Sequence, residues 1–180
     1  MFGACRDVMR FSLLTIVALF FFAGISISAR DWRGIVPLHS TRAEVERLLG
    51  PPDTDRGAAI FYNVDFSRVS FHFPQSPCGG PGASWNVAPN IVTDIWVIQN
   101  PPHEVRLGDI KLGDGFRTEK DPELGYILNY INDADGISYQ VDKSWSDTIT
   151  LTEYFPAAKD NHMRCPIVTR RTNAWSGLAS

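Results

Sequence analysis

No apolar run in this sequence is long enough for a transmembrane helix, which needs about 20 residues. The most apolar segment, residues 11–23, follows Arg6 and Arg10 and precedes the small residues of GISISA. A basic, then an apolar, then a small-residue region is typical of a secretory signal peptide. We therefore predict a signal peptide over residues 1–29, cut after Ser28 or Ala29. An uncleaved membrane anchor is the alternative. A lipoprotein signal is not indicated, because it needs a cysteine just after the apolar segment, and the only early cysteine, Cys5, precedes it.

Basic runs, nucleotide-binding loops and metal-ligand sets are absent as well. The chain has 17 basic and 20 acidic side chains and a net charge of −3, whereas nucleic-acid binding depends on a basic surface that neutralises phosphates. No phosphate loop, dinucleotide-binding turn or zinc-ligand spacing occurs. We therefore predict no nucleic-acid partner, no cofactor and no metal site.

Cysteine is scarce: the chain has three, and Cys5 lies in the predicted signal peptide. In an oxidising compartment, an isolated pair of cysteines is more often a disulfide than a metal or catalytic site. We predict a disulfide between Cys78 and Cys165, with free thiols as the alternative.

A catalytic set is also missing. His39 beside Ser40, and His162 near Cys165, are the pairs from which a nucleophile and a base could be drawn, and neither lies in a known nucleophile motif. The segment DADG, residues 133–136, contains part of a calcium-loop pattern, but its first ligand position would fall on an isoleucine. It is typical of a turn between strands. We predict no catalytic residue.

The clearest local signal that the sequence does contain is a short helix after residue 40. Ser40 or Thr41 can cap its start, and Glu44 lies at capping-box distance from Thr41. Val45 and two leucines share one face by the helical period. Gly50 is placed to end the helix in the left-handed conformation, and the two prolines after it prevent continuation.

Strand patterns fill most of the remaining chain. Residues 58–64 and 68–73 predict a hairpin, and residues 90–99 a third strand before a Pro-Pro break. Residues 126–131, 137–141 and 147–155 repeat this order of strand, turn, strand, loop and strand. Residues 103–125 are ambiguous between a short strand and one helical turn.

Aromatic residues are frequent in these strands. Most such side chains pack in a core or on a covered sheet face. A protein-binding face is the second interpretation, since exposed aromatic side chains are good anchors for a partner. The residues we assign to this face are Trp96, Phe61, Tyr62 and Tyr154.

The stretch LHSTRAEVERLLGPPD, followed by IFYNV, RVSFHF and IVTDIWVIQ, resembles the SmpA/OmlA-like family over about residues 34–99. The resemblance rests on Thr41, Val45, Leu49, Gly50 and Pro52. This family includes the small lipoprotein of the outer-membrane β-barrel assembly machinery, and its fold recurs in tandem in β-lactamase inhibitor proteins. It implies a helix followed by a three-stranded antiparallel sheet. The segments WRGIVPLHSTRAEVERLLGPP and YFPAAKDNHMRC also resemble a group of uncharacterised exported bacterial proteins.

Together these patterns predict an α+β fold, with a short N-terminal helix packed on an antiparallel sheet. Two similar helix/loop–three-strand units are expected in tandem, over residues 30–102 and 103–165, before a loosely held tail over 166–180. We expect an exported, periplasmic or secreted, non-enzymatic protein that binds another envelope protein and has no stable membrane span once the signal is removed. The alternative function is an exported hydrolase with an unidentified active site.

Overall fold

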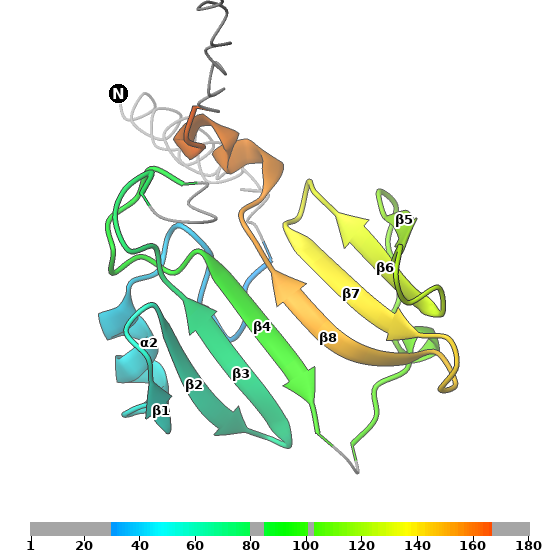
Figure 1. Cartoon of the computed structure of the whole chain (residues 1–180). Helices are drawn as coiled ribbons and strands as arrows, with labels where there is room; N and C mark the ends of the chain where they lie inside the picture. Colours follow the sequence, from blue (N-terminus) through cyan, green and yellow to red (C-terminus); the bar gives the residue numbers. More distant parts are fainter. Residues whose placement is uncertain (1–29, 80–84, 101–102, 167–180) are drawn as a thin grey trace, which may run out of the picture.

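The structure, a computed structural model, describes residues 30–79, 85–100 and 103–166, so the predicted signal peptide and the tail after Pro166 lie outside it. Eight strands form one antiparallel sheet in the order β1-β2-β3-β4-β8-β7-β6-β5 (Figure 1). The strands are β1 (Thr54–Asp55), β2 (Ala59–Val64), β3 (Ser67–His72), β4 (Asp94–Gln99), β5 (Arg117–Lys120), β6 (Ile127–Asn132), β7 (Ile137–Asp142) and β8 (Thr148–Tyr154). The helical elements of the described chain are α2 (Arg42–Leu49) and the 3-10 helices η1 (Leu107–Asp109) and η2 (Ala158–Met163).

Helix α2 begins and ends where the sequence predicts. Thr41 is the N-cap and forms the full capping box with Glu44, which satisfies backbone N–H groups at the start of the helix. Gly50 follows the last turn with φ +82°, a value that favours glycine, but its ψ of −167° is extended. The predicted left-handed cap is therefore wrong in ψ, although the helix does end at this residue.

The predicted hairpins are confirmed, and their turns explain the register. Between β2 and β3 the two turn residues Asp65 and Phe66 both have positive φ, as in the type I′ turn that matches the twist of paired strands. Gly136, also with positive φ, closes the turn between β6 and β7. The prediction that DADG, residues 133–136, forms a turn between strands is therefore confirmed. The third predicted strand begins later than expected, at Asp94, because the residues before it pair with the segment that leads into α2. The sequence does not predict strand β1, and β5 lies within residues 103–125, for which it leaves a short strand and a helical turn open.

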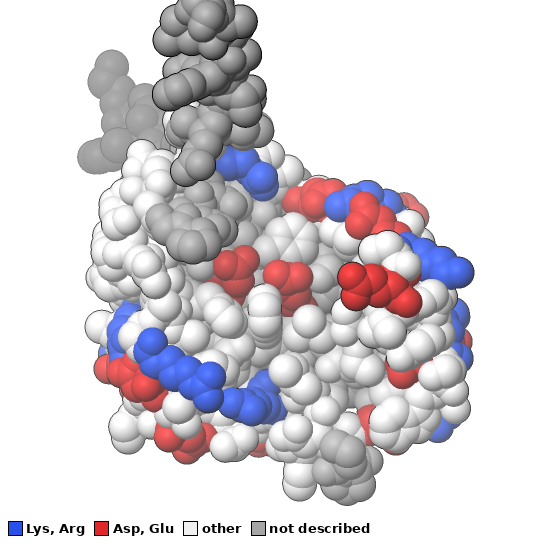
Figure 2. Space-filling view, in the orientation of Figure 1, with Lys and Arg blue, Asp and Glu red and all other residues white. Residues whose placement is uncertain are grey.

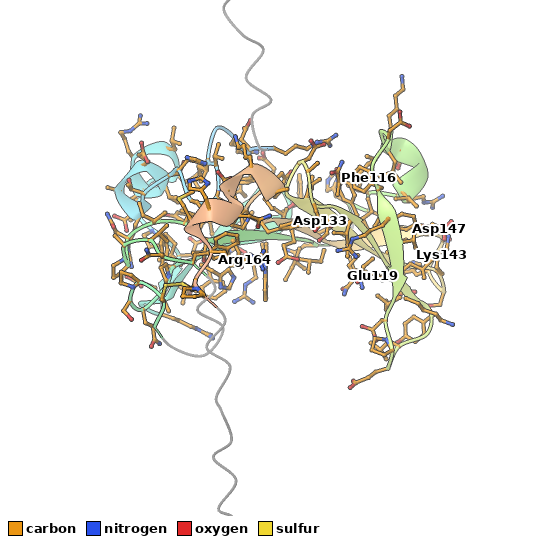
Figure 3. All side chains as sticks on the ribbon, turned by 90° about the horizontal axis from the view of Figure 1, so that it is seen from above. Phe116, Glu119, Asp133, Lys143, Asp147 and Arg164 are labelled. Atoms are coloured by element: carbon orange, nitrogen blue, oxygen red, sulfur yellow. A yellow bond between two sulfur atoms is a disulfide. The ribbon has the colours of Figure 1, made fainter. Side chains whose placement is uncertain are left out.

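One side of the sheet carries the core, which lies on both halves of the sheet and leaves the outer strands β1 and β5 exposed. Val45 of α2 and Ile35 pack on the first half, in a cluster with Ile60, Val69, Phe71 and other buried side chains. The segment around η1 covers the second half: Val105, Leu107, Ile110, Leu112 and Phe116 pack on Ile137, Tyr139, Val141 and Ile149. The ambiguous residues 103–125 thus contribute one 3-10 turn and its flanks to the core. Figure 3 shows α2 and Phe116 on the same side of the sheet.

The two predicted groups of strands meet where β4 pairs with β8, so residues 30–102 and 103–165 share one continuous sheet. The protein is mostly β, and the α+β prediction holds only in that an α-helix packs on the antiparallel sheet. In the described part of the chain, no helix has the length and apolar character needed to cross a membrane.

The predicted disulfide is confirmed. Cys78, in the loop between β3 and β4, is bonded to Cys165, which follows η2. The loop is also tied to the same segment by a backbone hydrogen bond from Asn86 to Met163 and by Arg164, whose guanidinium lies over the ring of Trp85. A covalent bond thus joins the first half of the sheet to the segment that follows its last strand.

Candidate functional site

The second side of the sheet, opposite α2 and η1, carries the polar and exposed side chains of the inner strands. We call it the open face. Because residues that pair across strands share a face, the register identifies its members: Phe61, Arg68, Ser70, His72, Asp94, Trp96, Ile98, Leu151, Glu153, Ser138 and Gln140. Figure 2 shows this face, with acidic side chains near its middle, uncharged ones around them, and basic side chains with acidic neighbours toward its lower left.

The centre of the open face lies at the β4–β8 junction, where Trp96 pairs with Glu153. The indole N–H of Trp96 donates to Oε1 of Glu153 at 3.2 Å, and the hydroxyl of Ser138 on β7 donates to Oε2 at 3.3 Å. Glu153 is thus fixed by one neutral donor from each neighbouring strand. The carboxylate is oriented, while Trp96 itself remains 39% exposed.

His72 and Asp94 complete this cluster, since they pair with each other two residues away from the Ser70–Trp96 pair of β3 and β4. The ring of His72 lies against that of Trp96, with 4.5 Å between centroids, and its Nε2 is 3.0 Å from the hydroxyl of Ser70. We call His72, Asp94, Trp96 and Glu153 the Trp96 cluster. It brings three titratable groups from three strands to one place.

Burial favours the neutral form of each titratable group in the Trp96 cluster, so it raises the pKa of the two carboxyl groups and lowers that of the imidazole. Burial raises the pKa of Asp94, and the hydrogen bond with Thr93 opposes this only in part. Burial, followed by the charge of Asp94, raises the pKa of Glu153 against the hydrogen bonds from Trp96 and Ser138. Burial lowers the pKa of His72 despite the nearby charge of Glu153. At neutral pH the cluster therefore holds carboxylates that are costly to ionise and a neutral imidazole.

Replacement of these carboxylates by amides should stabilise the protein at neutral pH. A carboxyl whose folded pKa is raised stabilises the fold most when protonated, below its ordinary pKa of about 4, and less as the pH rises through the folded value. We expect Asp94→Asn to raise the melting temperature at neutral pH. Glu153→Gln should raise it by less, because the glutamine side chain also has to keep the hydrogen bonds with Trp96 and Ser138. Calorimetry at neutral pH and at pH about 4 measures this, and the advantage should disappear at the lower pH.

The exposed carboxylate Glu123 supplies the control, because it lies outside the Trp96 cluster. Glu123→Gln should leave the melting temperature nearly unchanged. A lower melting temperature for Asp94→Asn at neutral pH would contradict the pKa assignment.

The four aromatic residues assigned to a binding face divide between the two sides of the sheet. Trp96 and Phe61 lie on the open face, where Phe61 is flanked by the guanidinium groups of Arg56 and Arg68. Tyr62 is buried under α2 and donates to the backbone oxygen of Gly50, so its assignment is wrong. Tyr154 is half-buried and packs against both core clusters, which also removes it from the face.

The histidine pairs considered in the sequence are not assembled as nucleophile and base. His39 instead contacts the buried carboxylate of Asp160 at 3.1 Å, while the hydroxyl of Ser40 accepts from the backbone N–H of Val36. His162 contacts the backbone oxygen of Lys159, and the sulfur of Cys165 is in the disulfide. Within the described residues, no group of three or more His, Cys, Asp or Glu side chains is placed to hold a metal ion.

Sequence reasoning missed His72, Asp94 and Glu153. A signal for two of them was present: the alternation in RVSFHF puts Ser70 and His72 on the face opposite Val69 and Phe71. Asp94 likewise interrupts an apolar run. Their meeting with Glu153, about 60 residues further along the chain, depends on the β4–β8 pairing.

A pocket of about 150 Å³ lies beyond the Trp96 cluster, at the end of β4. It is lined by Ile98 and Gln99 of β4, His103, Glu104, Trp145 and the start of β8. Trp145 is 52% exposed and Ile98 is 41% exposed. Ile98 belongs both to the open face and to the lining of this pocket, so the two share one residue of β4.

Comparison with known protein families finds no matching family, and comparison with curated proteins finds no matching sequence. Among solved structures, the chain is similar to a DUF4309 family protein (YjgB) from Bacillus subtilis, with a TM-score of 0.46 and 13% sequence identity. The similarity covers 70% of this chain and 84% of that chain.

Proposed function

We propose that this protein is exported and non-enzymatic, and that it binds another protein through the open face. The observation that carries the proposal is the exposure of Trp96 and Ile98 side by side on β4, in the middle of a sheet whose other side holds the core. Exposed large apolar side chains clustered on one surface are typical of interaction sites, and tryptophan is among the residues that contribute most to interface energy.

Two further features support export. Residues 1–29 have the pattern of a secretory signal peptide. The Cys78–Cys165 disulfide is a bond that persists in oxidising compartments such as the periplasm or the extracellular space. The resemblance of residues 34–99 to the SmpA/OmlA-like family agrees with a role in the cell envelope, so a periplasmic or secreted location and an envelope partner belong to the same proposal.

Site-specific photo-crosslinking in the native host tests the proposed binding face. A photoreactive amino acid in place of Leu151, on the open face, should give a defined adduct, whereas the same amino acid in place of Ala43, on the exposed side of α2, should not. Against the purified adduct protein, Trp96→Ala should weaken binding at least about tenfold. Leu48→Ala, which removes an exposed apolar side chain from α2, should leave the affinity unchanged.

Adducts that form equally from positions 151 and 43 would overturn the proposed face. So would an unchanged affinity of the Trp96→Ala variant for the crosslinked partner. Circular dichroism of each variant checks that it is folded.

The Trp96 cluster favours one second candidate, an exported hydrolase. A carboxyl group with a raised pKa beside a second carboxylate and a neutral imidazole is a combination that acid–base catalysis uses. Turnover of simple ester, amide or glycoside substrates by the purified protein, lost in Glu153→Gln and retained in Glu123→Gln, would establish it over the binding proposal.

A further inference from the structure

Building on the proposed function, we propose that the open face recognises an extended segment of the partner protein through one basic side chain. A lysine or arginine of that segment lies against Trp96 and pairs with the carboxylates of Asp94 and Glu153. An apolar side chain further along the same segment occupies the pocket beside Ile98.

The charges of the Trp96 cluster carry the first step. Both oxygens of Glu153 receive hydrogen bonds from neutral donors, and the ion pairs found among the described residues include neither Glu153 nor Asp94. His72 adds no positive charge at neutral pH, because burial lowers its pKa. Two partly desolvated carboxylates without a cation among the described residues are complementary to a basic group of the partner.

Trp96 supplies the second step, because its ring is exposed and fixed. The hydrogen bond to Glu153 and the contact with His72 hold the indole in place beside the carboxylates. A cation close to a tryptophan ring is attracted by its π electrons, and more strongly when a carboxylate is within reach and water is partly excluded. The arrangement therefore favours arginine or lysine over a neutral side chain of similar size.

The geometry of β4 sets the spacing within the partner segment. Asp94, Trp96 and Ile98 lie on the same face of one strand, and Asp94 and Ile98 are four residues apart. At about 3.3 Å per residue in a strand, these positions span about 13 Å. An extended peptide that follows β4 spans the same distance over four residues, so its basic and apolar side chains should be four positions apart.

Two arginines near β2, at the edge of the open face, favour one placement of the partner's basic group. Arg68, on the open face, and Arg56, at the β2 edge, both contact the ring of Phe61. A basic side chain of the partner is repelled there and attracted at the Trp96 cluster. Figure 2 shows basic side chains toward the lower-left edge, with acidic ones beside them, whereas the charged side chains in the middle are acidic.

Nuclear magnetic resonance titration of the full, oxidised protein tests the inference. The probe is a short synthetic peptide with one arginine and, four residues further on, one leucine. The matched peptides carry citrulline, the neutral isostere, or glutamate in place of the arginine. We expect the arginine peptide to shift the indole N–H signal of Trp96 at millimolar concentration, and to bind about tenfold more tightly than the citrulline peptide.

The double variant Asp94→Asn/Glu153→Gln should abolish the difference between the arginine and citrulline peptides, while Glu123→Gln should keep it. Since the amide variants are expected to be more stable than the wild type, such a loss is not explained by unfolding. Equal binding of the two peptides, tighter binding of the glutamate peptide, or no shift of the Trp96 signal would overturn the inference. The proposed function fails separately, if Trp96→Ala leaves the photo-crosslinked partner bound.

Discussion

Replacement of both Cys78 and Cys165 by serine should lower the free energy of unfolding by about 4 kcal/mol. The disulfide joins residues separated by 87 positions, so it removes a large part of the conformational freedom of the unfolded chain. It also connects the loop before β4 to the segment after β8. Strands β4 and β8 pair with each other and so join the two halves of the sheet. We therefore expect the whole domain to unfold at lower denaturant concentration in a single transition.

Urea denaturation followed by tryptophan fluorescence measures this effect. The wild type treated with reductant should follow the curve of the double serine variant. Unchanged midpoints would contradict the stabilising role. Two free thiols on the purified wild type, labelled under denaturing and non-reducing conditions, would show that the bond is not formed.

Gly136→Ala is expected to have the second largest effect, a loss of about 3 kcal/mol of stability. Gly136 has φ +68° in the turn between β6 and β7, a conformation that residues with a side chain rarely adopt. A Cβ atom at this position would also lie 2.1 Å from the backbone oxygen of Phe155 and 2.9 Å from the backbone nitrogen of Ala157. These are backbone atoms, so the turn has to move away from the end of β8.

That movement would break the hydrogen bonds between the turn and the chain after β8, which run from Phe155 to Gly136 and from Ala158 to Asp133. Gly57→Ala is the matched control, because Gly57 also has positive φ, at +74°, but nothing lies within 4 Å of its added Cβ. Thermal unfolding should show a small loss for Gly57→Ala and a large one for Gly136→Ala. Equal losses would mean that only the backbone conformation matters at residue 136.

The local elements of this protein follow from short-range patterns. The capping box of Thr41 and Glu44 involves residues three positions apart, and the turn of Asp65 and Phe66 joins strands that are adjacent in the sequence. Such features involve neighbouring residues, so a single sequence reveals them. The disulfide is the long-range exception, since with Cys5 assigned to the signal peptide only one pairing of cysteines remained.

The assignment of aromatic residues to one face was limited by the same kind of reasoning. Successive residues of a strand point to opposite sides of the sheet, so Phe61 and Tyr62 cannot share a face. The sequence shows that the two side chains lie on opposite sides of the sheet, but not which of the two sides faces the core. Helix α2, by packing on Tyr62, leaves Phe61 on the open face.

What the sequence determined by itself was therefore the capped helix, the hairpins, the pairing of Cys78 with Cys165 and the absence of known catalytic motifs. Only the tertiary structure decided that β4 and β8 lie side by side and that residues around η1 cover the second half of the sheet. The Trp96 cluster depends on both. Strand pairing between distant segments is selected by burial of the whole apolar face, and no local pattern near His72, Asp94 or Glu153 specifies that they meet.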